Sequence, residues 1–586
     1  MPDTYPANIE LDDNLRQALL NTPSVEQEPL HDGDLPLHKA AYKGDNSQLA
    51  TLIKSGASIN ARGVYYYTPL QLAVRGNHGE TVRILLAAGA DATLEDGLET
   101  HGNPPVDAVI YAAWRGAQDA LEALLAFGVK LSASALRKAA SLNHVECMRM
   151  ILEKLGRDDF SDKSRSQGLL AALNAAATCW HLEAVEVILA CVASIPAEFN
   201  AEDGWLSYAL ICAAGEFDCD DRCRWNQMPG YQQLVMQQLI AAGADVNWEH
   251  PPTGSTAFTA VLEFRELSAQ AVRLLLDNGL NLDKKFRDGR TPLLGIVENH
   301  NEDVGLVRAF LEAGAKATDQ DDELNTPLHI AAHRSFAELL FGHGADIFTK
   351  NRNGMTPFQT ACEDGRVGVA EFLLSQGANV HEISTESQCT PLLFATGASR
   401  REGSFPRNAE EQEQIVQLLL THGANTQVAT PDGRTPLHGA ARRGSVLQAK
   451  SLLEHGADVH AVTSDGETVL HAVCNVSDSR RAERTALINL LLDHGAQLEA
   501  RDQNGSTPLH ASWWPCNRVI YGFEPDLFNL LLTRGANPLA ENKEGKTPFD
   551  LIDDKKWACD EEGMVRERSS SHTQEVTQVE EVSGSN

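Results

Sequence analysis

The sequence lacks long hydrophobic runs, a leader-like N-terminus and a regular cysteine pattern. No stretch approaches ~18 consecutive apolar residues, so no membrane-spanning helix is expected. Met1 to Asn8 lack the basic and apolar regions of a secretory signal. The 11 cysteines are odd in number and irregularly spaced, which favours a reduced protein over a disulfide framework. These absences predict an intracellular protein, cytoplasmic or nuclear.

Positive charge is also scarce. The chain has 49 Lys and Arg against 81 Asp and Glu, so its formal net charge is −32. An acidic surface repels nucleic acid and anionic membranes, because both are polyanions. We therefore expect neither as a partner, and we expect a protein partner with a basic surface. The alternative is that the charge serves solubility alone.

One repeated motif runs through most of the sequence. The chain of 586 residues exceeds the ~250–300 residues that a single core supports, so it forms several domains or one elongated array. The motif Thr-Pro-Leu-His begins at Thr326, Thr435 and Thr507. Most copies are followed by Leu-Leu-x-x-Gly-Ala, as at Leu452 to Ala457. Near copies of the first motif, in places 33 or 34 residues apart, begin at Thr68, Thr291, Thr356, Thr390, Thr468 and Thr547.

The unit spanning 432–461 shows why these residues recur. Pro436 suits the first helical position, where no amide donor is needed. Ala440 is small and lets a neighbouring helix approach. Gly444 and Gly456 can each end a helix in the left-handed conformation. The resulting order of turn, helix, turn and helix resembles the ankyrin repeat, whose period is about 33 residues and whose mark is T-P-L-H-x-A.

The resemblance covers nearly the whole chain. It implies an all-α fold, a curved superhelical solenoid of helix-turn-helix units with short β-turn or hairpin tips. Counting the weaker copies gives fourteen units and a partial one at Thr547 to Ile552. The alternative for 105–250, where the Thr-Pro pair is missing, is an unrelated α-helical domain. The predicted organisation is an N-terminal cap or flexible segment at 1–30, ankyrin repeats at 31–285 that are degenerate in about 105–250, well-patterned repeats at 286–555 and a disordered acidic tail at 556–586.

The resemblance also implies a function. Ankyrin repeats act as binding scaffolds, so we expect a non-enzymatic protein–protein interaction scaffold or adaptor whose partner docks on the concave face. The alternative is a substrate-receptor or regulatory subunit of an enzyme complex such as a ubiquitin ligase. Insertions between the two helices of a unit should project from one edge of the solenoid, and they are often binding loops. Three such insertions are predicted: Glu216 to Gln232, Ser399 to Glu413 and Trp513 to Pro525.

Two aromatic groups are the candidate protein-binding residues. Exposed aromatic side chains commonly dominate the affinity of protein interfaces. The alternative is local packing, of the tyrosines against the next turn and of the insertion aromatics over helix ends. The first group, at a turn tip, is Tyr65, Tyr66 and Tyr67, and the second, in the third insertion, is Trp513, Trp514, Tyr521 and Phe523.

Signals for catalysis or metal binding are weak. Gly545-Lys546-Thr547 resembles the end of a phosphate-binding loop, but that motif requires glycine at position 540, which is Ala540. Cys219 and Cys223 form one Cys-x₃-Cys element without a second pair nearby, although Cys212 precedes them. We therefore predict no catalytic residue, no cofactor and no metal, the alternative being an enzyme hidden within 105–250.

Most histidines belong to the repeat itself. We expect them to form hydrogen bonds near helix ends and turns rather than to act as catalytic bases, which need a perturbed group in a cleft beside a partner. One set holds the fourth position of Thr-Pro-Leu-His or its near copies: His38, His329, His438, His471 and His510. A second set precedes the Gly-Ala pair: His343, His422, His455 and His494.

Uneven stability follows from the uneven patterning. In a repeat array each unit contacts only its neighbours, so local sequence quality sets local stability. Residues 291–547 should exchange their amide hydrogens more slowly than residues 105–250. Hydrogen exchange followed by mass spectrometry measures both segments in one experiment, and the reverse order would contradict the prediction.

Overall fold

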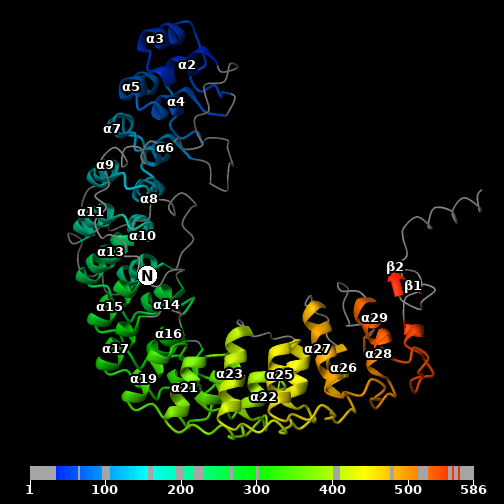
Figure 1. Cartoon of the computed structure of the whole chain (residues 1–586). Coiled ribbons are helices and arrows are strands. Elements are labelled where there is room, and N and C mark those ends of the chain that lie inside the picture. Colours follow the sequence, from blue (N-terminus) through cyan, green and yellow to red (C-terminus); the bar gives the residue numbers. More distant parts are fainter. Residues whose placement is uncertain are drawn as a thin grey trace, which may run out of the picture. The chain divides into compact units, whose positions relative to one another are not determined.

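Short helices arranged in pairs are the main secondary structure of the described part of the chain (Figure 1). The chain divides into two units, Met1–Leu280 (unit 1) and Asn281–Asn586 (unit 2). Even-numbered labels denote the first helix of each pair and odd-numbered labels the second. The computed structural model describes residues 35–63, 66–95, 106–155, 163–192, 204–215, 229–263, 268–286, 288–298, 303–399, 409–474, 481–512, 525–551, 557–559 and 565–567.

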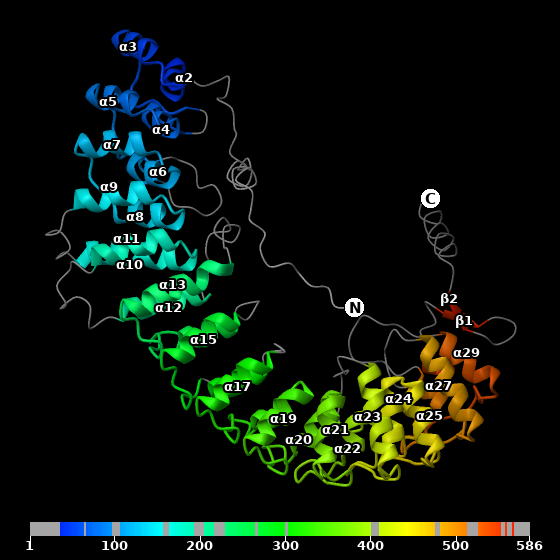
Figure 2. The same ribbon diagram turned by 60° about the vertical axis from the view of Figure 1, so that its left-hand side comes forward.

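Unit 1 contains seven helix pairs in its described residues. Figures 1 and 2 show successive pairs side by side, with first helices next to first helices and second helices next to second helices. The helices are α2 (Pro36–Lys43), α3 (Asn46–Lys54), α4 (Pro69–Arg75), α5 (Gly79–Ala87), α6 (Ala108–Arg115), α7 (Gln118–Ala126), α8 (Ala133–Ser141), α9 (Val145–Leu155), α10 (Lys163–Thr178), α11 (Leu182–Val192), α12 (Trp205–Ala214), α13 (Pro229–Ala241), α14 (Ala257–Glu263) and α15 (Ala269–Asp277).

Unit 2 repeats this arrangement with seven further pairs among its described residues, a 3₁₀ helix and two short antiparallel strands. Its elements are α16 (Pro292–Glu298), α17 (Val304–Glu312), α18 (Pro327–Ile330), α19 (Arg334–Gly342), α20 (Pro357–Asp364), α21 (Val367–Ser375), α22 (Pro391–Thr396), α23 (Ala409–Thr421), α24 (Pro436–Arg443), α25 (Val446–Glu454), α26 (Val469–Cys474), α27 (Arg481–Asp493), α28 (Pro508–Ala511), α29 (Pro525–Thr533), η3 (Phe549–Leu551), β1 (Trp557–Cys559) and β2 (Val565–Glu567).

Local sequence explains where each helix begins and ends. In the pair α20–α21, Thr356 precedes the helix in an extended conformation and Pro357 takes the first helical position. Gly365 ends α20 with φ 80°, and Gly377 follows α21 with φ 101°. Glycine adopts this left-handed conformation without the steric cost that a side chain brings. The same residue types mark the start and end of the first helix α24, from Thr435 to Gly444.

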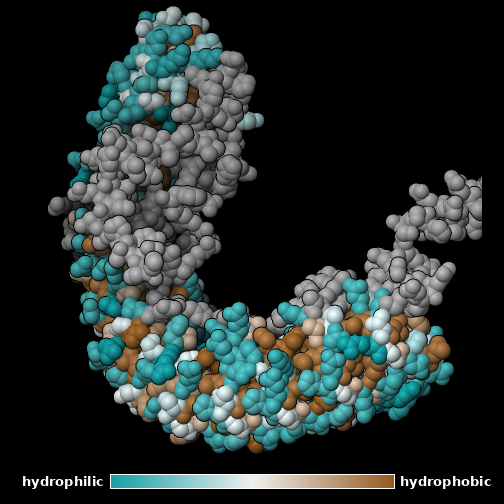
Figure 3. All heavy atoms as spheres, in the orientation of Figure 1, coloured by the Kyte–Doolittle hydropathy of each residue, from teal (hydrophilic) through white to brown (hydrophobic). Residues whose placement is uncertain are grey.

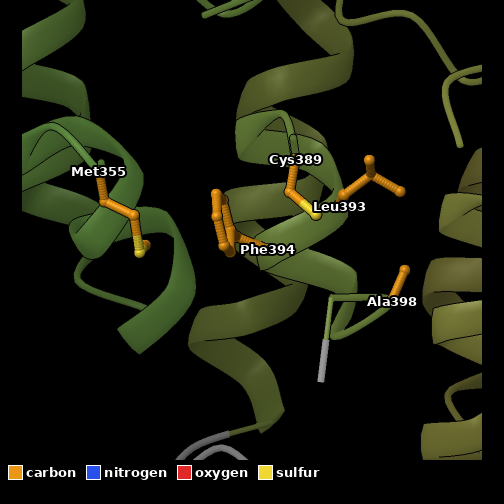
Figure 4. Packing of buried hydrophobic residues seen from close by; sticks show 5 residues of the cluster. All are labelled: Met355, Cys389, Leu393, Phe394 and Ala398. Carbon is orange, nitrogen blue, oxygen red and sulfur yellow. The ribbon is translucent and has the colours of Figure 1, made fainter. Parts of the chain in front are cut away.

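Packing between neighbouring pairs forms the core. Ala440 and Ala441 of α24 are fully buried or nearly so, because adjacent first helices approach closely there. Figure 4 shows one apolar cluster that joins consecutive pairs in unit 2. Met355 enters it from the turn before α20, Phe394 from α22, and Val428 packs against it from the turn before α24. No pair could bury these side chains alone, so each depends on its neighbours.

The turn tips of unit 2 are joined by backbone hydrogen bonds from one repeat to the next. Arg352 donates its N–H to the carbonyl of Glu323 at 2.8 Å, and Gln503 donates to Asp465 at 2.8 Å. The equivalent donor position before α24 is Pro431, which has no N–H. The series of backbone hydrogen bonds between successive turn tips is therefore interrupted at Pro431.

The segment 105–250 forms the same kind of helix pairs as the rest of unit 1, from α6 to α13. Its first helices also end at a left-handed residue, which is Gly116 in one pair, Asn143 in the next and Trp180 in the third. Asn tolerates this conformation, whereas a bulky residue such as Trp180 adopts it only when its surroundings hold it there. The indole N–H of Trp180 donates to the carbonyl of Ala213 at 2.8 Å, which supplies that restraint.

The all-α array confirms the predicted fold class, and the fourteen described pairs match the predicted number of units. Each of the three insertions falls between the two helices of a pair, as predicted. Two of them end earlier than expected, because α13 begins at Pro229 and α23 at Ala409. Glu410 and Glu411 favour the longer α23, since carboxylates stabilise the N-terminal turn of a helix.

The ends of the chain are described only in part. The predicted cap at 1–30 lies outside the described residues. Strands β1 and β2 lie within the predicted tail at 556–586, and β2 contacts α29. Among the described residues, no helix is both long enough and apolar enough to cross a membrane.

Two glycines of one repeat provide a matched test of the packing. Gly116 and Gly128 both have positive φ, 68° and 85°, so alanine at either site carries ~1–2 kcal/mol of backbone cost. A Cβ on Gly116 would lie 2.6 Å from the His144 ring, whereas a Cβ on Gly128 would meet nothing within 4 Å. We expect Gly116→Ala to lower the free energy of unfolding by ~1–3 kcal/mol more than Gly128→Ala, measured by urea denaturation. Equal losses would show that the His144 ring moves aside at no cost.

Candidate functional site

Buried histidines hold each turn tip in place. In the pair α24–α25, Nδ1 of His438 accepts the N–H of Thr435 at 3.2 Å, and Nε2 donates to the carbonyl of Glu467, just before the next threonine, at 3.3 Å. These distances fit the neutral imidazole with its proton on Nε2. The equivalent contacts are made by His329 to Thr326 and Met355, by His471 to Thr468 and Ser506, and by His510 to Thr507 and Lys546.

Burial keeps these imidazoles neutral. Removal from water penalises the charged form, and it lowers the pKa of both His329 and His438 to about 4. The pKa of His471 is lowered for the same reason. Two repeats use glutamine instead: Gln359 accepts the N–H of Thr356 at 2.9 Å and donates to the carbonyl of Glu382 at 2.9 Å. Histidine and glutamine thus both supply a neutral group that accepts on one side and donates on the other, whereas leucine holds the position in the units that begin at Thr291 and Thr390.

The histidines before the Gly-Ala pair have the expected structural role. Each ring donates from Nδ1 to a backbone carbonyl at the C-terminus of a second helix, as His494 does to Leu490 at 2.9 Å. His343, His422 and His455 make the same contact with Leu339, Leu418 and Ser451 at 2.8–2.9 Å.

A further group of histidines, which includes His144 and His181, connects the first helices of neighbouring repeats in unit 1. These residues precede second helices, and each Nε2 lies near a carbonyl at the end of the preceding first helix. His144 lies 3.2 Å from the carbonyl of Trp114, and His181 lies 3.1 Å from that of Ser141. Burial lowers the pKa of both rings. The sequence does not reveal this role, because the partner carbonyl lies 30 to 40 residues earlier.

The tyrosine tip contains the described residues that best fit the predicted binding group. Tyr66 is 55% exposed and adopts φ 61° at the end of the turn. Its carbonyl accepts a hydrogen bond from Nη1 of Arg62 at 2.9 Å. Tyr67 is half-buried, and its ring lies 5.8 Å from that of Tyr111, which is buried. The structure therefore separates the group into one exposed ring and one packed ring.

An aromatic row continues from Tyr67 into the next repeat. The rings of Tyr111 and Trp114 are 5.6 Å apart, and the guanidinium of Arg75 lies 5.9 Å from the centre of the Tyr67 ring. The last distance is within range of a cation–π interaction. Burial raises the pKa of the Tyr111 phenol. Sequence analysis missed Tyr111 and Trp114, since only the stacking of α4 on α6 brings them to the tyrosine tip.

The remaining candidate residues lie outside the described residues. They are Tyr65, Trp513, Trp514, Tyr521, Phe523, Cys219 and Cys223.

The ionisable groups of the described residues do not form a metal-binding cluster. Within the part of the chain that the structure describes, no three His, Cys, Asp or Glu side chains gather as a metal-binding group. A cavity of about 460 Å³ lies between the N-terminal ends of α23 and α25 in unit 2. Glu410, Glu413, Arg443 and Ser445 are among its lining residues. The Ser445 hydroxyl caps α25 by accepting the Gln448 N–H at 3.3 Å, so it serves the helix.

Comparison with known proteins gives the repeats a family. The family model described as "Ankyrin repeats (3 copies)" matches residues 9–96, 267–351, 296–384, 328–403 and 407–463. Human transient receptor potential cation channel subfamily A member 1 is 26% identical over 451 residues, which are 70% of this chain and 38% of that protein. The E3 ubiquitin-protein ligase KEG of Arabidopsis thaliana is 24% identical over 422 residues, 66% of this chain and 24% of that protein.

Among solved structures, the human ASB11 ankyrin repeat domain is similar with a TM-score of 0.34 and 24% identity, over 42% of this chain and all of that domain. The chain spans less than two-fifths of the length of either curated relative.

The buried histidines predict a defined pH dependence. The pKa of His438 is about 4 in the folded chain and about 6.5 when unfolded. Between these values the unfolded chain binds the extra proton, so stability falls as the pH drops from 6.5 to 4. The full loss is about 3 kcal/mol for this group. His438→Gln should shrink the fall in melting temperature between pH 7.5 and 5.0, because glutamine keeps both contacts without titrating.

His460→Gln is the matched control, since His460 is exposed in the same repeat. It should leave the pH dependence unchanged. If His438→Gln and His460→Gln gave identical pH profiles, the buried imidazole would not be responsible.

Proposed function

Because this chain is an ankyrin-repeat protein, we propose that it is a non-enzymatic scaffold or adaptor that binds another protein on its first helices and turn tips. The observation that supports this proposal best is the tyrosine tip. Tyr66 presents most of an aromatic ring to solvent from a turn that Arg62 braces. Large exposed aromatic rings on a fixed backbone are typical of residues that dominate binding energy.

The described polar groups support a structural rather than a catalytic use. Both ring nitrogens of the buried histidines are used in structural hydrogen bonds, as in His438, which accepts from Thr435 of its own turn and donates to Glu467 of the next. Cys362 and Cys474 are buried, and burial raises the pKa of both thiols, which disfavours the reactive thiolate.

A receptor subunit of an enzyme complex is the second candidate. The similarity to a plant protein named as an E3 ubiquitin-protein ligase, over 66% of this chain, favours it. A receptor subunit requires a segment that binds the enzyme, and residues 1–30 are the candidate for that segment. Deletion of 1–30 should then abolish co-purification of a ligase while other partners remain bound.

The tyrosine tip gives a direct test of the scaffold proposal. Tyr66→Ala should reduce recovery of the main co-purifying protein about tenfold or more, the effect expected for loss of a hot-spot ring. Quantitative affinity purification of the full chain from its native cell provides the measurement. Phe127→Ala is the control, since Phe127 is 56% exposed at the end of a second helix, close to the 55% of Tyr66. Equal recovery with both variants would exclude the tip as a binding element.

A further inference from the structure

Carboxylates are absent from six of the seven first helices described in unit 1. The first helices α2, α4, α6, α8, α10 and α12 contain no Asp or Glu. The second helices α5, α7, α9 and α11 carry exposed carboxylates, such as Glu80, Asp119 and Glu183. The absence of carboxylates from these six first helices contrasts with the net charge of −32 of the whole chain. The seventh first helix of unit 1, α14, ends in Glu263. In unit 2, α16 and α20 carry carboxylates, whereas the first helices α18, α22, α24, α26 and α28 carry none.

The first helices of unit 1 instead carry basic residues. Lys43, Arg115 and Arg137 are exposed on α2, α6 and α8. We name these three, together with the half-buried Lys39, Arg75 and Lys138, the unit 1 basic face. Carboxylates that border these helices serve as helix caps. Asp107 accepts the N–H of Ile110 at 2.8 Å, and Asp45 accepts that of Gln48 at 2.9 Å.

Aromatic rings lie among these basic groups. Tyr42, Arg75 and Trp114 occupy the same position in three successive pairs, two residues before the left-handed residue that follows each first helix. Because α2 contacts α4 and α4 contacts α6, these three residues form a continuous stripe. The stripe leads to the tyrosine tip through Arg75 and Tyr67. In Figure 3 the described surface over α2 to α5 is predominantly hydrophilic, which suits a polar partner.

We propose that the unit 1 basic face binds an acidic segment of a partner protein, with arginine and lysine pairing its carboxylates and Tyr42, Trp114 and Tyr66 packing on its apolar groups. Planar guanidinium groups bind carboxylates well, and Tyr, Trp and Arg are the residues that dominate interface energy. The inference rests on the proposed scaffold function and specifies the partner's chemistry. For this surface we therefore propose an acidic partner, whereas the net charge of the chain predicted a basic one.

Screening explains why the acidic chain would not repel such a segment. Charges farther apart than the Debye length, about 8 Å at physiological ionic strength, scarcely interact. A helix with its side chains is about 10 Å across, so the carboxylates on the outer sides of the second helices lie beyond that distance. A segment lying on the first helices therefore meets the local positive charge, which also steers its approach.

Charge reversal tests this inference. The probe is a fluorescein-labelled peptide of five Glu-Asp-Gly repeats, and fluorescence anisotropy measures its binding to the full chain. The triple variant Lys43→Glu, Arg115→Glu and Arg137→Glu should weaken binding at least tenfold, and tripling the salt concentration should weaken the unaltered chain in the same direction. All three side chains are exposed, so the melting temperature should stay unchanged.

The matched control reverses three exposed charges on second helices, Lys54→Glu, Arg83→Glu and Arg149→Glu. It should change peptide affinity less than twofold. Equal weakening by both triple variants would overturn the proposal. So would tighter binding, through the same residues, of an oligothymidine or of phosphatidylserine vesicles, because the surface would then serve nucleic acid or membrane.

A native partner separates this inference from the proposed function. If Tyr66→Ala loses the partner while the charge-reversed chain keeps it, the scaffold function stands and the acidic partner is wrong. If neither variant alters recovery, both proposals fail.

Discussion

A neutral hydrogen-bonding group, buried between neighbouring repeats, joins successive turns wherever histidine or glutamine holds the fourth position of the motif. In the pair α24–α25 the imidazole of His438 accepts from the threonine of its own turn and donates to the turn that follows. A charged ring could not accept on Nδ1, and an apolar side chain would leave the Thr435 N–H and the Glu467 carbonyl without this partner. Burial lowers the pKa of His438 to about 4 and so maintains the neutral form.

This arrangement separates structure from recognition within each repeat. The buried side of a first helix, with its alanines and its histidine or glutamine, must match its neighbours closely. Its exposed positions carry no such requirement, so Tyr42, Arg75 and Trp114 can differ at one equivalent position. In unit 1 the first helices α2, α6 and α8 carry lysine or arginine, while glutamates lie on the second helices α9 and α11. Net charge, a property of the whole chain, is therefore a poor guide to any one face.

A contact was predictable from sequence when its two residues lie close together in the chain. Contacts within a repeat obey a spacing of a few residues, so Thr435, Pro436 and Gly444 were sufficient to predict a helix with its start and end. The pairs in 105–250 were also predictable from alanines and turn residues, although Thr-Pro is absent there. Spacing rules do not predict which residue of a neighbouring repeat a side chain contacts.

The missed residues illustrate this limit. His144 reaches a carbonyl 30 residues earlier, and Gln412 reaches the carbonyl of Glu363, 49 residues earlier, across an insertion. Tyr111 joins Tyr67 only because α4 stacks on α6. Trp180 is the hardest case, since a left-handed tryptophan is unfavourable until its indole finds the carbonyl of Ala213.

Pro431 shows that the two edges of the stack in unit 2 are held independently. It removes one tip-to-tip hydrogen bond, so the ladder on that edge is interrupted between α22 and α24. The helices across the same junction remain close: a Cβ on Gly439 would lie 2.7 Å from the backbone of Thr396 and Ala398. Arg443 adds a hydrogen bond to the carbonyl of Ala395. Neighbouring repeats are thus coupled through their helices even where their tips are not hydrogen-bonded to each other.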